Sequence, residues 1–429
     1  MNNYITIVLL FLATAYSPSV VGQQIDTIAI KKPMDFLSFI SAVGRENVAY
    51  AAARFDLDIA QAEIQTAGIF PDPELGFGWF NNGERRMKMG YGFTSEMTWT
   101  LELGGKRKAR VNLARDQHEL TSYLLDDYFR NLRADATIAY LRAIQNRQLL
   151  VVQLNSYQQL SQLAASDSIR YQLGVISQVD ARQSKLEAGA SLNEVYAAEA
   201  QYNMAISALS LLIGDSDRDL PVEPQGDLLN FDRTFNLQEL ITSALNNRAD
   251  LKAALQSKNV SASVLRLARA NRALDLGLTL GGTYSSYARN AIAPTPAFTT
   301  VNAGLSIPLK FSNGRSGELP AARYASLQGE QLYRQTELEV RTSVVQAFYA
   351  YQSAGKQVRQ FDRGLLSEAL AILDGKVYSY KRGETSLLEL LNAQRTYNEV
   401  QQGYYQALYG YAEALVELER ASGIWDINF

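Results

Sequence analysis

Residues that could bind metals or act as nucleophiles are scarce in this sequence. Its 429 residues include no cysteine and one histidine, His118. Zinc sites made of cysteine and histidine, iron–sulfur clusters, thiol catalysis and disulfide frameworks therefore lack the ligands they need. Met87 and Met89 carry the soft thioether sulfur that copper prefers, but we expect both to pack within a loop. A lone histidine is also a poor metal site, so no metal site and no cofactor are predicted.

Carboxylates are the remaining side chains with catalytic potential. No acidic pair clusters outside the helical repeats described below, so the sequence does not predict an enzyme. The 41 basic residues are balanced by 44 acidic ones, which gives a net charge of −3. Such a chain has no net field that attracts phosphates, and nucleic-acid binding is disfavoured.

The proline positions indicate that long helices must position any functional residues. None of the ten prolines lies between Pro73 and Pro221, and none follows Pro320. Because proline breaks helical hydrogen bonding, both stretches permit very long helices. Apolar residues recur there at intervals of three and four, which predicts two antiparallel helical pairs over about 107–213 and 320–422. We expect about 50 to 60 residues per helix, or roughly 75 to 90 Å.

Two segments instead alternate with period two, which is typical of β-strands. From Tyr91 to Leu103 apolar side chains alternate with Gly, Thr, Ser and Glu, and 74–80 has the same character. The pattern returns in the second half of the chain. The sequence thus predicts hairpins over about 74–103 and 274–310, with strands of about 8–13 residues, close to the roughly 9–11 that cross a bilayer.

Two interpretations of these hairpins stay open. Either they form a sheet with one buried face in a soluble protein, or their apolar face meets lipid while the polar face lines a barrel lumen. Four strands cannot close a membrane barrel, because such barrels begin at about 8 strands and an open edge in lipid leaves backbone groups unsatisfied. Several copies would then assemble, and three copies would give about 12 strands. All helices and both termini would lie on one side of the membrane.

The helical turns show an internal duplication. Residues 171–177 read YQLGVIS and precede Asp180, and residues 380–386 read YKRGETS and precede Glu389. The order helix, hairpin, long helix, long helix therefore occurs twice. The predicted units are a first structural repeat at 23–220, an inter-repeat linker at 221–233 and a second structural repeat at 234–429.

The N-terminal segment 1–22 is predicted to be a cleaved signal peptide. Ile5–Ala15 is an apolar run too short to span a membrane, and Val20 and Gly22 are small enough for a cleavage site after residue 22. No cysteine follows, so we expect an exported protein without a lipid anchor on cysteine.

Two motifs complete the pattern. Residues 68–75 read GIFPDPEL before the first strand, and residues 101–107 read LELGGKR after the second. With the paired glycine turns and the duplicated order, these motifs make the chain resemble the TolC family of outer-membrane efflux channels, particularly its CzcC-like branch. The resemblance covers essentially the whole mature chain. The basic residues Lys106, Arg107, Lys108 and Arg110 beside the second motif are expected to solvate the first helical turns at the membrane boundary.

This resemblance implies a mainly α-helical protein with membrane β-hairpins. It would be a homotrimer in the outer membrane, whose β-barrel of about 12 strands continues as a long periplasmic α-helical barrel. It would act as the passive exit duct of a tripartite efflux system, docking to a periplasmic adaptor (membrane fusion) protein and an inner-membrane RND-type pump. The exported substrates would be heavy-metal cations or small toxic compounds. From the residues alone, a soluble periplasmic coiled-coil scaffold protein is the alternative.

The resemblance also implies a periplasmic gate. Glu389 and Asn392 match the constriction, where family members often have two acids, so Asn392 argues against a double acidic ring. Tyr380 and Thr385 match links between helices, and Asp180 matches their partner in the first repeat. Thr385 stands where a basic residue can occur, so no salt bridge to Asp180 is expected. A simpler interpretation is that Asp180 and Glu389 are solvated helix-face acids.

The two glycine turns match the segments that meet the adaptor in this family, although each glycine could equally serve as a helix C-cap. The implied adaptor contacts are Leu173, Gly174, Val175, Ser177, Arg382, Gly383 and Ser386.

Overall fold

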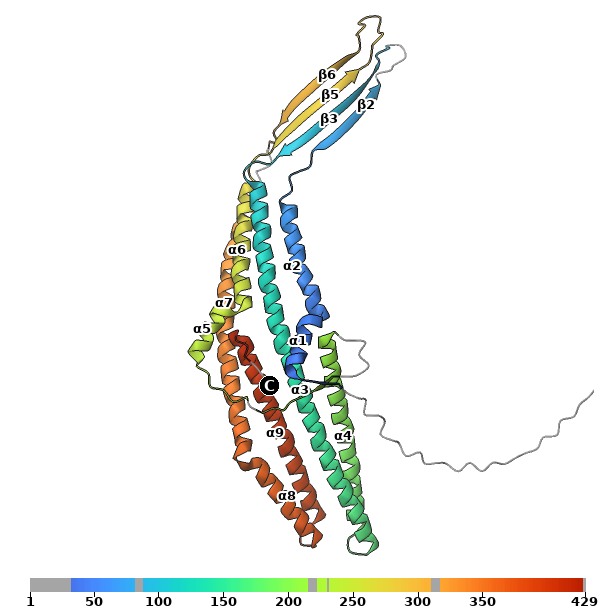
Figure 1. The fold of residues 1–429 in the computed structure, drawn as a ribbon, viewed down its shortest axis with the longest axis vertical. Helices are drawn as coiled ribbons and strands as arrows, with labels where there is room; N and C mark the ends of the chain where they lie inside the picture. Colours follow the sequence, from blue (N-terminus) through green and yellow to red (C-terminus); the bar gives the residue numbers. More distant parts are fainter. Residues whose placement is uncertain (1–31, 82–87, 215–221, 230, 310–316, 427–429) are drawn as a thin grey trace, which may run out of the picture.

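The molecule is elongated, with a β-sheet at one end and two helical turns at the other (Figure 1). The computed structural model describes residues 32–81, 88–214, 222–229, 231–309 and 317–426. The predicted signal peptide at 1–22, Met87, and residues 221 and 230 of the predicted linker lie outside the described residues.

Both halves of the chain place two shorter helices before a β-hairpin and a long helical hairpin after it. In chain order the first half forms β1 (Lys32–Met34), α1 (Phe36–Glu46), α2 (Val48–Ala67), β2 (Glu74–Asn81), β3 (Tyr91–Leu101), α3 (Lys106–Gln172) and α4 (Gln178–Ile213). The second half forms β4 (Val222–Pro224), α5 (Leu237–Asn247), α6 (Ala249–Ala270), β5 (Leu276–Ser285), β6 (Phe298–Ser306), α7 (Glu318–Gln360), the π-helical turn η2 (Phe361–Leu365), α8 (Leu366–Lys381) and α9 (Leu387–Ser422).

The sequence order predicted one helix before each hairpin, whereas the structure has two. The first break occurs at Asn47, whose backbone is extended at ψ 117° and whose side chain accepts a hydrogen bond from the Tyr50 amide at 2.8 Å. Asparagine is a strong N-cap because its side chain satisfies an amide that the helix leaves free. Arg248 breaks the second helix in the same extended conformation.

The long helices are less equal in length than predicted. α3 has 67 residues, whereas α4 has 36. α4 ends at Gly214, which has a left-handed φ of 73°, and α9 ends at Gly423 with a φ of 69°. A Cβ on Gly214 would lie 2.4 Å from the carbonyl oxygen of Glu46. The returning helices therefore end against the shorter helices and do not reach the sheet.

The second long hairpin is bent where the apolar stripe predicted a continuous helix. Gly364 has a φ of 115° within η2, between α7 and α8. Glycine tolerates this backbone conformation because it has no Cβ, and a π-turn changes the phase of the helix that follows. The two turn glycines, Gly174 and Gly383, are 209 residues apart, so the equivalent of Gly364 in the first repeat is Asn155. Asn155 lies inside the uninterrupted α3. Only the α7–α8 arm therefore bends in this way.

The two β-hairpins form one antiparallel sheet in the order β2-β3-β5-β6. They join through β3 and β5, with Trp99 opposite Leu278. All four strands lie within the two predicted hairpin ranges. Large apolar side chains along the sheet are exposed, including Phe77 at 67%, Trp79 at 69% and Val301 at 77%. The buried face expected of a soluble sheet is therefore missing from the described part of this protomer.

Two motifs of the sequence meet where the helices join the sheet. Gly104 and Gly105 have left-handed φ angles of 72° and 71°, which turn the chain from β3 into α3. Arg107 then donates a hydrogen bond to the carbonyl oxygen of Gly68 in the first motif.

Lys106 is buried, in contrast to the solvated side chain that the sequence predicted. Its Nζ lies 2.6 Å from both carboxylate oxygens of Asp275, in the segment that enters β5. A buried ammonium requires such a partner because desolvation penalises an unpaired charge. Lys106 therefore joins the two halves of the chain at the base of the sheet.

The predicted linker contains a strand. β4 pairs in parallel with β1, Lys32 opposite Val222. The pair is fixed to α3 by Tyr140, whose hydroxyl lies 2.8 Å from the Met34 carbonyl oxygen, and by Arg147, which donates to the Pro224 carbonyl at 2.8 Å. These contacts hold the middle of the chain against the long helix.

The main hydrophobic core lies at this middle level. It gathers buried residues from α1, α3, α4, α5, α7 and α9, and a smaller cluster lies near the helical turns, between α3, α8 and α9. Among the described residues, none of the helices combines the length and the apolar character needed to cross a membrane.

A buried acid anchors the C-terminal segment to this core. Glu419 is 1% exposed, its Oε1 accepts from Arg233 at 3.2 Å, and its Oε2 accepts from the Asp426 amide at 3.3 Å. Burial, followed by the neighbouring Asp426 carboxylate, raises the pKa of Glu419 to about 8. Arg233 also binds Asp426 directly, and Arg133 lies over the Trp425 ring at 4.0 Å.

Candidate functional site at the helical turns

The two helical hairpins turn in the same way. Gly174 and Gly383 have left-handed φ angles of 74° and 75°, as expected for glycine C-caps. Ser177 then caps α4 by accepting from the Asp180 amide at 3.1 Å, and Ser386 caps α9 by accepting from the Glu389 amide at 3.3 Å. Each acid follows its serine by three residues, as in a capping box.

Glu389 is held within its own hairpin. Its Oε2 accepts from Lys376 at 2.6 Å and from Thr385 at 2.7 Å. The bond from Lys376, followed by the one from Thr385, lowers the pKa of Glu389 below its usual value. Asn392 lies one turn further along α9 and is exposed. Glu389 is therefore an ionised, solvent-exposed carboxylate at the start of α9.

Within one protomer, the residues assigned to the links have the following partners. Asp180 accepts from Ser177 Oγ at 2.7 Å, and Thr385 binds Glu389 within its own hairpin. The Tyr380 hydroxyl instead donates to Asp167 Oδ1 at 2.9 Å. This bond joins α8 to α3, so Asp167 is the first-hairpin residue that holds Tyr380.

Asp167 lies in an unusual environment. It is 0% exposed, and its Oδ2 has no hydrogen-bond partner among the described residues. Arg170 approaches its Oδ1 at 3.6 Å and lies over the Tyr380 ring at 4.8 Å. Burial raises the pKa of Asp167, and the Tyr380 bond opposes this shift. Burial also raises the pKa of Tyr380.

The sequence contains a signal for the Asp167 site, but that signal is ambiguous. Asp167 and Arg170 are three residues apart and so share a face of α3. An (i, i+3) ion pair of this type usually lies on a solvated surface, and nothing local indicates that Tyr380 on a distant helix covers it. Reasoning from the turns alone therefore missed Asp167.

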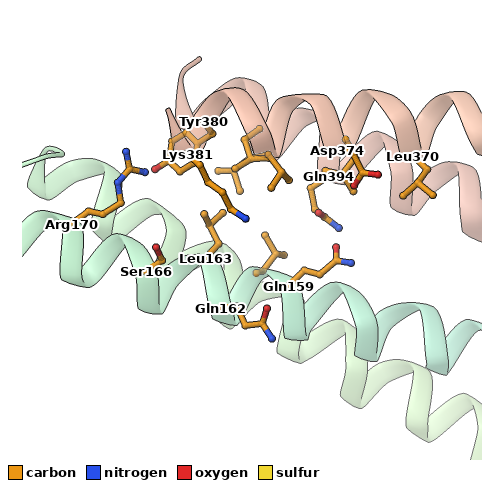
Figure 2. A pocket seen from close by; sticks show the side chains of 15 residues that line it. Gln159, Gln162, Leu163, Ser166, Arg170, Leu370, Asp374, Tyr380, Lys381 and Gln394 are labelled. Atoms are coloured by element: carbon orange, nitrogen blue, oxygen red, sulfur yellow. The ribbon is translucent and has the colours of Figure 1, made fainter. Parts of the chain in front are cut away.

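A cavity of about 610 Å³ lies beside this link, between α3, α8 and α9 (Figure 2). Leucine and valine side chains form much of its wall. Arg170, Tyr380 and Lys381 lie at one end, while Asp374, Gln394 and Gln159 lie towards the other (Figure 2). The two hairpins are therefore not closely packed at this level.

The proposed adaptor-contact residues form exposed tips. Leu173 is 73% exposed and Val175 is 62% exposed. Arg382 lies over the Tyr378 ring at 5.2 Å and pairs with Glu384 at 3.3 Å. Both tips thus present apolar or charged side chains to solvent, in positions available to a protein partner.

Metal-ligating side chains do not gather in the part of the chain that the structure describes. No group of three or more His, Asp or Glu residues with metal-binding geometry occurs among those residues. Met89 accepts a hydrogen bond from Asn290 Nδ2 at 3.4 Å.

Comparison with known proteins gives a consistent family. The family model described as outer membrane efflux protein matches residues 41–215 and 240–424. The cobalt-zinc-cadmium resistance protein CzcC of Cupriavidus metallidurans is 23% identical over 391 residues, covering 91% of this chain and 90% of CzcC.

Solved structures share the fold. The CmeC outer membrane channel of Campylobacter jejuni aligns with a TM-score of 0.75 and 14% identity, covering 90% of this chain and 84% of CmeC. CusC, whose crystal structures address folding and transmembrane channel formation, aligns with a TM-score of 0.74 and 18% identity, covering 91% of this chain and 92% of CusC.

Proposed function

This chain belongs to the outer membrane efflux protein family, and we propose on that basis that it is the exit duct of a tripartite efflux system. The family consists of passive channels, which fits a sequence without clustered catalytic groups. In this proposal the chain forms a homotrimer in the outer membrane. The energy for export comes from a separate inner-membrane pump of the RND type.

The exposed apolar side chains of the β-sheet carry this proposal. In the described protomer, β2 and β6 are the outer strands of the sheet, and each pairs with a neighbour on one side. Open strand edges cannot persist in lipid, because each unpaired backbone group costs several kcal/mol. Three copies, each supplying four strands, would remove these edges by closing a barrel of about 12 strands.

The helices extend this barrel as a periplasmic tunnel in our proposal. At 1.5 Å per residue, α3 is about 100 Å long, which suits a duct that crosses a periplasmic space. The units 23–220 and 234–429 act as two structural repeats that each contribute one helical hairpin to the tunnel wall. Residues 221–233 join them, and Pro224 in this linker accepts a hydrogen bond from Arg147 of α3.

We propose that heavy-metal cations are the exported substrates. The naming of CzcC as a cobalt-zinc-cadmium resistance protein favours this class, with small toxic compounds as the second possibility. The exposed turns around Gly174 and Gly383 would contact the periplasmic adaptor. The adaptor would in turn connect the duct to the pump.

The gate proposal assigns Glu389 and Asn392 to the narrow tip. Glu389 supplies one ring of ionised carboxylates in a trimer, because its pKa is lowered by Lys376 and Thr385. Tyr380 supplies the link between hairpins through Asp167. Asp180 keeps a local role, since in the described protomer its hydrogen bonds are with Ser177 in the same turn.

Lysine substitutions in the sheet test the membrane assignment. Leu278 and Leu305 face each other across β5 and β6, so Leu278→Lys and Leu305→Lys would place charges on the lipid side. Both positions lie within two residues of the helical end of their strands, where a lysine costs less than the roughly 2–4 kcal/mol of the bilayer midplane. The two substitutions are therefore combined, and together they should reduce recovery of a heat-sensitive trimer from outer-membrane fractions. Thr279→Lys, on the opposite face, is the matched control and should still insert.

A soluble protein in the periplasmic fraction, unaffected by the leucine substitutions, would instead support the coiled-coil scaffold.

The gate has a separate test. Glu389→Gln should reduce the preference for cations in single-channel recordings from planar bilayers. Unchanged selectivity and conductance would exclude Glu389 from the pore.

A further inference from the structure

The cavity between α3, α8 and α9 has features that a simple packing gap would lack. We propose that it binds a small organic anion with an apolar body and a hydrogen-bond acceptor. Its volume of about 610 Å³ is in the range of sites for drug-sized molecules. The proposal concerns binding inside the protomer and does not depend on which compounds the channel exports.

The cationic end of the cavity supplies the charge selectivity. Lys381 points its amine into the space between the helices (Figure 2), and it makes no ion pair with the described part of the chain. Arg170 beside it shares Asp167 at 3.6 Å. Of the residues that line the cavity, Arg170 and Lys381 are cations, and Asp374 towards the other end is the one carboxylate. The lining therefore keeps a net positive charge, located at the end with Arg170 and Lys381, which attracts an anion.

Gln394 supplies an unsatisfied donor. Its side chain lines the cavity and the residue is 7% exposed, yet its Nε2 has no hydrogen-bond partner among the described residues. A buried unpaired donor costs about 1–3 kcal/mol, and most buried polar groups in proteins are paired. An acceptor on a bound molecule would remove this cost.

Apolar side chains line the space between these polar groups. They come from all three helices, so a rigid apolar body would touch each of them. The residues concerned are Leu160, Leu163, Leu370, Leu373, Val377, Leu390 and Leu391. An occupant would consequently bridge the first hairpin to the second, beside the link between Tyr380 and Asp167.

A pair of dyes tests the charge preference. Fluorescein is an anion with a three-ring body and peripheral oxygen acceptors, and rhodamine 123 is a cation built on a similar ring system. Fluorescence polarisation with the purified full-length oligomer in lipid nanodiscs should show saturable fluorescein binding, at least about tenfold tighter than that of rhodamine 123. This comparison uses the unmodified protein and needs no variant.

Substitutions then locate the site. Arg170→Gln combined with Lys381→Gln should weaken fluorescein binding by about tenfold or more, since bonds to charged groups contribute about 1.5–3 kcal/mol. Gln394→Leu should weaken it by about two- to tenfold, as expected for a neutral hydrogen bond. Lys185→Gln is the matched control, because Lys185 is an exposed cation on α4 outside the cavity. It should leave the affinity unchanged.

Hydrogen exchange provides a readout independent of affinity. Bound fluorescein should slow amide exchange in 159–170 and 370–381 but not in α2. The proposal is overturned by equal affinity for the two dyes, by a double variant that binds as tightly as the unmodified protein, or by an equal loss in Lys185→Gln. Absence of saturable fluorescein binding would also overturn it.

Discussion

Tyr380→Phe should release the second helical hairpin from the first at the tip of the molecule. The substitution removes only the hydroxyl that donates to Asp167 at 2.9 Å. Asp167 is 0% exposed, and its other oxygen already lacks a hydrogen-bond partner among the described residues. Without Tyr380, the buried carboxylate keeps Arg170 at 3.6 Å and the neighbouring Ser184 side chain.

The size of the effect follows from the charge on the acceptor. A hydrogen bond to a charged group contributes about 1.5–3 kcal/mol, and a buried carboxylate left with fewer partners adds a desolvation penalty. A change of 1.4 kcal/mol is tenfold in an equilibrium constant. The arrangement with α8 linked to α3 should therefore lose about 10- to 150-fold in population relative to the separated arrangement.

Single-channel recording in planar bilayers measures this change. The conductance level that dominates in the unmodified protein should have shorter dwell times in Tyr380→Phe, and a second level should become frequent. Circular dichroism and the heat stability of the oligomer check that the variant is folded.

Asp180→Asn is the decisive control. The family resemblance implies that Asp180 is the first-repeat partner of the link between the helices. In the structure, however, its side chain binds Ser177 in its own turn. It should behave like the unmodified protein, whereas Asp167→Asn should resemble Tyr380→Phe. If Asp180→Asn shortened the dwell times and Asp167→Asn did not, the reasoning from the buried bond would be refuted.

Three further predictions concern positions away from this link. Gly364→Ala should destabilise the protein by about 1–3 kcal/mol in thermal or denaturant unfolding, because alanine is strained at a φ of 115°. The control Gly375→Ala, inside α8, should be neutral or slightly stabilising. Equal effects of the two substitutions would contradict the strain argument. The pKa of Glu419 is raised from 4.5 to about 8, so the folded state binds this proton more tightly than the unfolded state does. The stability that Glu419 contributes should therefore fall as the pH rises from about 4.5 to about 8. Glu419→Gln should flatten this part of the plot of stability against pH, and an unchanged slope would exclude Glu419 as its source. Lys106→Met should lower the free energy of unfolding by about 3–5 kcal/mol, because it leaves Asp275 without its partner at 2.6 Å. The double variant with Asp275→Leu should recover much of that stability. If it recovers none, packing around Lys106, and not the ion pair, accounts for the loss.

Local sequence patterns were sufficient to predict most elements. The four strands lie where period-two alternation placed them, since a half-exposed strand must alternate its side chains. The helical turns lie at Gly174 and Gly383, because a left-handed backbone is open mainly to glycine. The family could also be recognised, as the matching family model confirms.

Helix breaks were harder to predict. The apolar stripe continues across Gly364 without a visible change in spacing, and a single glycine within a helical pattern is often tolerated. The extra residue of the π-turn became apparent only in the structure. Likewise, the capped break at Asn47 interrupts a helical region whose residues otherwise favour a continuous helix.

Contacts between distant segments decided the candidate site. Tyr380 and Asp167 are 213 residues apart, and Lys106 and Asp275 are 169 residues apart. Composition and periodicity describe only local backbone preferences and which faces are apolar. They contain no information on which polar group on one long helix meets which group on another.

The sequence by itself therefore determined the helices, the hairpins and the paired glycine turns, because each depends on residues that are close along the chain. Only the tertiary structure decided that Tyr380 binds Asp167 and leaves Asp180 to its own turn. It also decided that α3, α8 and α9 leave a cavity between them, with a largely apolar wall and polar groups at its ends. Both results follow from the relative rotation and bending of helices, which packing across the whole molecule sets.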